Sequence, residues 1–197
     1  MSGAGIVGVL LAAGIGRRFD PSGARLKLLE PAPGDSAGQP LAAAALRRLA
    51  ASLEDVVAVV RPADTAAQAA LHALLQAGGA ELVVCAEARS GMGHSIACGV
   101  AARANARGWV IALADMPSIA VATIAAVRDA IAAGEHAAVP VFGGRPGHPV
   151  GFAAACREEL LALTGDRGAR QVLAAHAPLR IKVEDPGCLV DIDTPTD

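Results

Sequence analysis

Short apolar runs alternate with helical patterns along this chain, and the alternation constrains its fold more than any single motif does. Five of these runs predict strands: Ile6–Leu11, Val56–Val60, Leu82–Cys85, Trp109–Leu113 and Ala137–Val141. Nearly continuous apolar strands are typical of a sheet that is covered on both faces. The pattern therefore predicts an α/β fold with a mostly parallel, doubly wound sheet and right-handed crossovers.

The segments between the strands carry leucine and isoleucine at helical spacing. Three sets are expected to face the core: Leu46, Leu49 and Leu53; Leu71, Leu74 and Leu75; and Ile124, Val127 and Ile131. Pro40 precedes the first set and suits the start of a helix. Asp64 precedes the second set and is expected to cap it. The carboxyl ends of the strands are where ligands bind in such sheets, so Gly14 and Asp115 are expected to lie near each other.

Composition narrows the class of protein. A length of 197 residues suits one domain, and 53% hydrophobic residues exclude a disordered chain. Aromatic residues make up 2%, which argues against the stacking platforms that bind single-stranded nucleic acid. A net charge of −2 gives no electrostatic reason to bind nucleic acid or an anionic membrane. We expect neither as a partner.

Cysteine usage and the N-terminal segment bear on location. Cys85, Cys98, Cys156 and Cys188 contain no C-x-x-C pair, so they are expected to be small core residues or incidental thiols in a reducing compartment. The apolar stretch 6–16 has no positive charge before it and two arginines after it, which is the wrong polarity for a signal peptide. No apolar run reaches the length of a membrane span, so a cytoplasmic protein is expected.

A glycine turn follows the first strand and points to phosphate chemistry. Gly14 and Gly16 are followed by Arg17, Arg18 and then Lys27. Glycine allows backbone N–H groups to approach a ligand, and cations beyond the turn can neutralise phosphate oxygens. The chain contains no Gly-Lys-Ser or Gly-Lys-Thr of a P-loop. From these residues alone, a tight turn with solvated arginines is an equal alternative.

Two residues weaken a dinucleotide-binding Rossmann motif. Phe19 stands where its third glycine belongs, and Arg61 follows the second strand where an acidic residue would bind the ribose. The segment 20–38, rich in proline, glycine and alanine, is expected to form a mobile flap over the site.

Six segments in order resemble the MobA-like nucleotidyltransferases, and the branch they resemble most is the molybdenum cofactor cytidylyltransferases. The first consists of Leu-Ala-Ala-Gly-x-Gly-x-Arg-Phe at 11–19 together with Lys-Leu-Leu at 27–29. Gly-Met-Gly-His-Ser-Ile at 91–96 and Leu-Ala-Asp-Met-Pro at 113–117 follow. The last three are Gly-Arg-Pro-Gly-His-Pro at 144–149, Gly-Asp-x-Gly-Ala-Arg at 165–170 and Asp-Ile-Asp-Thr-Pro at 191–195.

The resemblance implies a fold and an activity. It implies one MobA-like NTP transferase domain over residues 1–197, a Rossmann-like three-layer sandwich of the nucleotidyltransferase (GT-A) type. The implied reaction moves an NMP unit from an NTP, expected to be CTP, to a phosphorylated acceptor of the molybdopterin type. A molybdoenzyme or its chaperone is a further expected partner. The alternatives are a guanylyl- or sugar-phosphate-nucleotidyltransferase of the same fold, and a non-catalytic nucleotide-binding accessory protein for a molybdoenzyme.

Site residues are carried over from the family onto matching positions. The implied catalytic residues are Lys27, Arg18 and Asp115. The implied nucleotide-binding residues are Leu11, Ala12, Ala13, Gly14, Gly16, Lys27, Ser95 and Asp115. Ser95 is expected near a helix N-terminus, which favours anions, although a plain N-cap is an equal interpretation.

A divalent cation, Mg²⁺ or Mn²⁺, is expected at Asp115 with Asp191 or Asp193. Mg²⁺ prefers one or two carboxylates together with water and phosphate oxygens. If 189–193 is extended, the two later aspartates point the same way, and Asp191 is slightly favoured. The structural alternatives are that Asp115 caps the following helix and that the later pair is solvated.

Two residues are implied to bind the acceptor, His148 and Arg170. A phosphate nucleophile is already ionised near neutral pH, so His148 is expected to bind or shape a loop rather than act as a base. Asp166 is expected to cap the helix that contains Val172 and Leu173. His94 departs from the small residue expected there and is interpreted as a cavity-lining or exposed variant.

Overall fold

An eight-stranded mixed sheet forms the centre of the computed structural model, which describes residues 5–14, 19–20, 25–33 and 38–193. The strands are β1 (Ile6–Leu11), β2 (Val56–Val60), β3 (Glu81–Val84), β4 (Gly108–Leu113), β5 (Ala137–Phe142), β6 (Arg145–Pro146), β7 (Val150–Ala153) and β8 (Leu179–Lys182). Their order is β3-β2-β1-β4-β7-β5-β6, and β8 pairs with β5.

The first four strands in this order are parallel, as the alternation predicted. β1 pairs in parallel with β2 and β4, and β2 with β3. β7 lies antiparallel between β4 and β5, and β8 is parallel to β5. β1 and β2 have the predicted bounds, and β3, β4 and β5 differ by single residues. β6, β7 and β8 were not predicted, because β6 and β8 contain charged residues and the short β7 contains a glycine.

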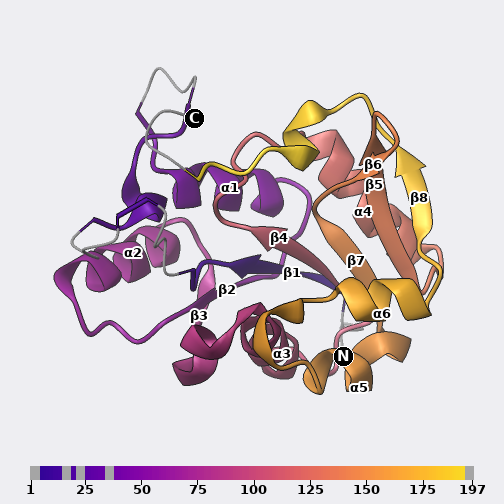
Figure 1. Ribbon diagram of the computed structural model, residues 1–197, viewed down its shortest axis with the longest axis horizontal. Helices are drawn as coiled ribbons and strands as arrows, with labels where there is room; N and C mark the ends of the chain where they lie inside the picture. The colour runs from indigo at the N-terminus through magenta and orange to yellow at the C-terminus, as the bar shows by residue number, and fades with distance from the viewer. Residues whose placement is uncertain (1–4, 15–18, 21–24, 34–37, 194–197) are drawn as a thin grey trace.

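Helices cover both faces of the sheet, which gives three layers (Figure 1). They are α1 (Leu41–Ala50), α2 (Ala66–Ala77), α3 (Met92–Ala102), α4 (Val121–Ala132), α5 (Arg157–Leu161) and α6 (Arg170–Ala175). Short 3₁₀ turns lie between them: η1 (Lys27–Leu29), η2 (Ala86–Ser90), η3 (Ala154–Cys156), η4 (Gly165–Arg167) and η5 (Pro186–Leu189).

Side chains that alternate along the strands pack into two separate cores, one on each face of the sheet. Leu10 of β1 packs in the core under α1, α2 and α4, while Val9 packs in the core under α3, α5 and α6. This division follows from the two-residue period of a strand. The three predicted apolar helix faces lie in the first core, although Leu53 falls just beyond the end of α1 and Leu74 is only partly buried.

Two predicted helix caps are wrong. Thr65, rather than Asp64, caps α2, because its side chain accepts a hydrogen bond from the N–H of Gln68. Asp64 instead forms an ion pair with Arg89. Asp166 lies in η4 and α6 has no side-chain cap. In each case a neighbouring residue or turn takes the position that the spacing had assigned to an aspartate.

The segment predicted as a mobile flap is packed where the structure describes it. Leu26 and Leu28 lie in the first core, and Lys27 between them is 8% exposed. Two leucines at this spacing anchor η1 in the core beside α1 and α2, so this part is packed rather than a flap. Residues 21–24 and 34–37 of the segment lie outside the described residues.

The cysteines differ from the expectation in one respect. Cys85 follows β3 and forms a disulfide with Cys98 of α3, while Cys156 and Cys188 are free and buried. A separation of 13 residues is no recognised motif, so the pairing follows from the packing of α3 beside β3 and was not predictable. Among the helices that the structure describes, none is long and apolar enough to cross a membrane.

Candidate active site

Three charged side chains from distant parts of the chain converge beyond the carboxyl ends of the strands. Lys27 Nζ lies 2.8 Å from Asp115 Oδ2 and 3.5 Å from Asp193 Oδ1. Asp115 comes two residues after β4, Lys27 begins η1, and Asp193 follows η5. The side chain of Lys27 is 9% exposed, against 26% and 31% for the two aspartates. The lysine is therefore held deep in the site, and the carboxylates open toward solvent.

Asp115 is not the cap of the next helix, which was the alternative interpretation. α4 begins at Val121, and its first residues are instead held by the buried Asp185. Asp185 Oδ2 accepts hydrogen bonds from the N–H of Ala120 at 2.9 Å and from Thr123 Oγ1 at 2.7 Å. The Asp115 carboxylate is thus not used for capping α4.

Asp191 and Asp193 have different surroundings. Residues 190–193 form no strand and Leu189 belongs to η5, so 189–193 is not one strand along which the two aspartates would point the same way. Ile192 is buried and its N–H donates to the carbonyl of Asp115 at 3.0 Å. Asp193 reaches Lys27, whereas Asp191 is exposed. The geometry associates Asp193 with Asp115, contrary to the slight preference for Asp191.

A cavity of about 480 Å³ opens in front of these charges. Its walls include six of the residues predicted to bind the nucleotide, which are Leu11, Ala13, Gly14, Lys27, Ser95 and Asp115. Ala12 is not among them. Its side chain is in the core, and its N–H donates to the carbonyl of Val59 at 2.9 Å. Gly16, Arg17 and Arg18 lie outside the described residues.

The start of α3 forms one wall of this cavity. Ser95 is 4% exposed and lies in the first turn of α3, so it is not the N-cap, which is Gly91. Gly91 has a φ of +130°, and a Cβ there would overlap the backbone of Gly165. The glycines of this motif let the helix start pack directly on the loop that precedes η4, and the free N–H groups at that start favour an anion.

His94 also holds the start of α3 in place. Its Nδ1 accepts a hydrogen bond from the N–H of Gly165 at 3.2 Å. It therefore ties α3 to the η4 loop, and is neither of the two variants expected from the sequence. The amide of one loop and the imidazole of the helix meet because Gly91 permits the close approach.

A second cavity, of about 820 Å³, adjoins the first and shares Met92 and Asp166 with it. Both residues predicted to bind the acceptor, His148 and Arg170, line this second cavity, together with Arg180. Gly147 precedes His148, whose N–H donates to the carbonyl of Cys188 at 2.8 Å. Burial lowers the pKa of His148, and the charges of Asp115 and Asp191 oppose that effect.

Arg61 is a residue of this region that was not predicted to belong to the site. It follows β2, is 8% exposed, and donates from one guanidinium nitrogen to the carbonyl of Gly14 at 3.4 Å. Its Nε has no hydrogen-bond partner among the described residues. Burial, together with the charge of Arg89, lowers the pKa of Arg61. The sequence does contain a pattern that could have predicted this position. Arg61 directly follows five apolar strand residues, and a residue there lies at the ligand-binding edge of the sheet.

The donor set at the first cavity fits a divalent cation of the kind expected. Asp115 and Asp193 approach the Lys27 ammonium from separate segments, at 2.8 Å and 3.5 Å, and both carboxylates are partly exposed beside it. Two carboxylates open to solvent are the ligands that Mg²⁺ or Mn²⁺ takes when water and phosphate oxygens fill its other positions. Asp191 does not reach the Lys27 ammonium in the structure.

Comparison with known proteins identifies the family of this chain. The model of the MobA-like NTP transferase domain matches residues 8–180. The purine catabolism protein PucB of Bacillus subtilis is 34% identical, over 96% of this chain and 92% of its own.

Solved structures share the fold of this chain. The crystal structure of Rv0371c from Mycobacterium tuberculosis is 25% identical and superposes with a TM-score of 0.78 over 98% of this chain and 95% of its own. A complex of Rv0371c with manganese, 23% identical, gives a TM-score of 0.68 over 98% of this chain and 92% of its own.

Proposed function

Since this chain belongs to the MobA-like NTP transferase family, we propose that it transfers an NMP unit from CTP to a molybdopterin-type acceptor and releases pyrophosphate. The observation that carries the proposal is the convergence of Lys27 with Asp115 and Asp193 at one end of the first cavity. A buried lysine beside two open carboxylates provides both the cation and the metal ligands that phosphoryl chemistry uses.

In this reaction an oxygen of the acceptor phosphate attacks the α-phosphorus of the nucleotide. The bond from that phosphorus to the bridging oxygen breaks, and pyrophosphate leaves with the electron pair. No side chain has to remove a proton, because a phosphate nucleophile is already ionised near neutral pH. The protein has to position two polyanions and compensate their charge.

Two parts of the chain meet that requirement. Lys27 Nζ can bind phosphate oxygens from its fixed position beside Asp115. The start of α3 presents free backbone N–H groups and the positive end of the helix dipole to the same cavity, with Ser95 beside them. Arg18 remains part of the proposal as a further phosphate ligand, although it lies outside the described residues.

Asp115 and Asp193 would hold Mg²⁺ or Mn²⁺, which supplies charge neutralisation at the phosphates when bound. The manganese complex of Rv0371c supports use of a divalent cation by a structurally similar protein. Asp191 is exposed, and its charge acts on His148, which lines the second cavity.

The two adjoining cavities support the assignment of two substrates. The first holds the glycine turn and the charged cluster and is assigned to the nucleotide. The second, lined by His148, Arg170 and Arg180, is assigned to the acceptor, whose phosphate the two arginines would attract. Met92 and Asp166 line both cavities, so a nucleotide in the first and an acceptor in the second would adjoin there. We also propose that the protein acts in the cytoplasm.

The proposal is tested by measuring pyrophosphate release with each of the four NTPs, Mg²⁺ and molybdopterin. Release that needs both the nucleotide and the acceptor, and that is fastest with CTP, is expected. Acceptor-dependent release that is faster with GTP would show that GTP, rather than CTP, is the substrate, and the proposed transferase activity would stand. A protein that binds NTP and releases no pyrophosphate with the acceptor would favour the accessory-protein alternative.

A further inference from the structure

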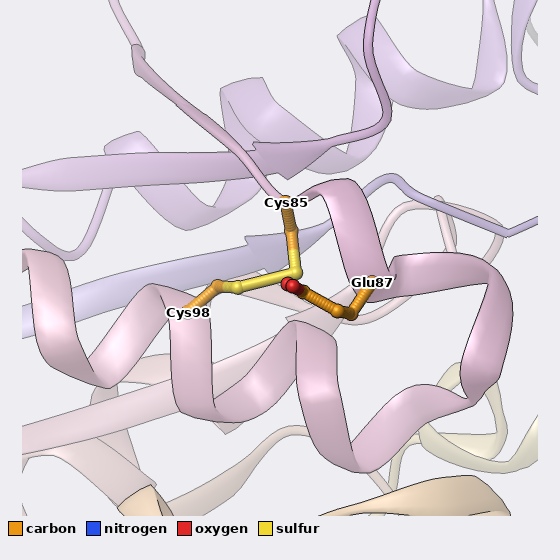
Figure 2. Close-up of side chains that lie close together, drawn as sticks. All are labelled: Cys85, Glu87 and Cys98. Carbon is orange, nitrogen blue, oxygen red and sulfur yellow. A yellow bond between two sulfur atoms is a disulfide. The ribbon is translucent and has the colours of Figure 1, made fainter.

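A second group of metal-ligating side chains lies outside the charged cluster of the active site. Cys85, Glu87 and Cys98 each offer a ligand atom, and these three atoms lie within 4.8 Å of one another. Figure 2 shows the Glu87 carboxylate directed at the sulfur atoms of the two cysteines. The residues come from three places: the end of β3, the η2 turn and the middle of α3.

The disulfide accounts for the two sulfur atoms but not for the carboxylate. A disulfide has no donor hydrogen to offer, so a carboxylate gains nothing from lying against it. Glu87 is exposed and has no ion-pair partner among the described residues that would draw it to this position. A cation held by the two thiolates after reduction of the disulfide, together with the carboxylate, would account for the position of Glu87.

We propose that the reduced form of this cluster binds a thiophilic divalent cation, with Zn²⁺ as the expected ion, through Cys85 Sγ, Cys98 Sγ and one oxygen of Glu87. Thiolate together with carboxylate is a donor set for Zn²⁺ rather than for Mg²⁺. Three protein ligands leave a fourth position for water. Cys98 is half-buried and Glu87 is exposed, so the ion has a path from solvent.

The oxidised and the metal-bound cluster are two forms of the same residues. A phosphine reductant with water cleaves the Cys85–Cys98 bond, giving two thiols and the phosphine oxide. Binding of the cation then displaces the two thiol protons into solvent. In a tetrahedral site the two sulfur atoms lie about 4 Å apart, a small opening for side chains whose Cα atoms are 6.0 Å apart.

The position of the cluster gives the ion a structural consequence. Ala88 and Arg89 of η2 and Met92 and Ser95 of α3 all line the first cavity, and all lie between Cys85 and Cys98 in the chain. A metal that joins η2 to α3 would hold this wall together in a reducing environment, where the disulfide cannot. The ion itself would remain separate from Asp115 and Lys27.

The test is a Co²⁺ titration of the full chain, reduced with a phosphine and kept free of oxygen. We expect the near-ultraviolet charge-transfer band that thiolate gives with Co²⁺, and loss of this band when Zn²⁺ is added. Cys98→Ser should lose the band, with circular dichroism showing that the variant is folded. The double variant Cys156→Ser/Cys188→Ser and Asp115→Asn should each keep it.

Glu87→Gln separates the carboxylate from the thiolates. This exposed substitution should keep the band but weaken Co²⁺ binding on the order of tenfold or more. Unchanged affinity in Glu87→Gln, a band that persists in folded Cys98→Ser, or no band in the reduced wild-type protein would each overturn the three-ligand site. None of these outcomes depends on transferase activity.

Discussion

Lys27 Nζ and Asp115 Oδ2 lie 2.8 Å apart, although 88 positions separate the two residues in the chain. Leu26 and Leu28 fix the backbone of the lysine in the core, and Asp193 approaches its ammonium from a third segment. A cation held in this way loses little side-chain freedom when it meets a phosphate. Such preorganised charge usually stabilises a transition state more than any other single effect does.

Substitution of Lys27 should therefore reduce turnover strongly. Lys27→Met retains the aliphatic part of the side chain and removes the charge, and we expect kcat/KM to fall on the order of a hundred- to a thousandfold. Lys182→Met, at a side chain that is 88% exposed, is the matched control and should have wild-type activity. Equal activities of the two variants in a pyrophosphate-release assay would remove Lys27 from the phosphate site.

The three aspartates should separate into two groups. Asp115→Asn and Asp193→Asn each remove a charge beside Lys27, and both should lower kcat and raise the Mg²⁺ concentration needed for half-maximal rate. Asp191→Asn removes an exposed charge outside this cluster and should leave the Mg²⁺ requirement unchanged. Metal titrations of the three variants check this. A shifted Mg²⁺ requirement in Asp191→Asn together with a normal one in Asp193→Asn would reverse the assignment.

Stability should depend on pH through His148. Burial holds its pKa below the ordinary value of about 6.5, so the unfolded chain takes up this proton at a higher pH than the folded protein does. The free energy of unfolding should therefore decrease as the pH falls below about 6.5, until the folded pKa is passed. His148→Gln should reduce that slope. Urea unfolding between pH 5 and 8 measures it, and identical slopes would contradict the prediction.

Gly91→Ala should disturb the wall of the nucleotide cavity. The positive φ alone costs about 1–3 kcal/mol for alanine, and the new Cβ would also overlap the backbone of Gly165. Gly134→Ala is the matched control, because its φ is +107° and its surroundings are open. We expect both variants to lose stability, and Gly91→Ala alone to bind the nucleotide more weakly. Equal losses of nucleotide affinity would show that the overlap is unimportant.

Nucleotide preference should depend on Ala13. Ala13 lines the cavity proposed for the nucleotide, and its methyl group would crowd a purine there more than a pyrimidine. One methyl group discriminates by about 1–3 kcal/mol, so CTP should bind more tightly than GTP without excluding it. Isothermal titration of the wild-type protein and of Ala13→Gly with both nucleotides tests this. Tighter binding of GTP by the wild-type protein would contradict the proposed preference for CTP, and the proposed transferase activity would not be affected.

The parallel part of the sheet was predictable because its strands are apolar on both faces. Val56–Val60 is buried throughout, and such a run has few alternatives in a chain that also shows helical periods. β6 and β8 were not predictable, since Arg145–Pro146 and Leu179–Lys182 are short and largely exposed. Their positions depend on pairing with β5, which no local pattern encodes.

The position of a site residue was predictable where the residue directly follows a predicted strand. It was less predictable where the conformation of a loop determines that position. Asp115 follows β4, so its place at the ligand-binding edge follows from the topology. The positions of Asp191 and Asp193 depend on where η5 ends and on the burial of Ile192, and spacing alone does not show that Asp193 is the one that reaches Lys27. Arg61 and the Cys85–Cys98 pair depend on contacts between distant segments.

The two cavities are proposed to hold a nucleotide and a phosphorylated acceptor for direct transfer of the nucleotidyl group. The most direct measurement follows phosphorus labels in a reaction with CTP, Mg²⁺ and molybdopterin. Label in the α-phosphate of CTP should appear in the acceptor, and label in the γ-phosphate should appear in pyrophosphate, with neither transfer in Asp115→Asn. Gamma-label released as inorganic phosphate, or an acceptor that never takes up α-label from any NTP, would contradict the account.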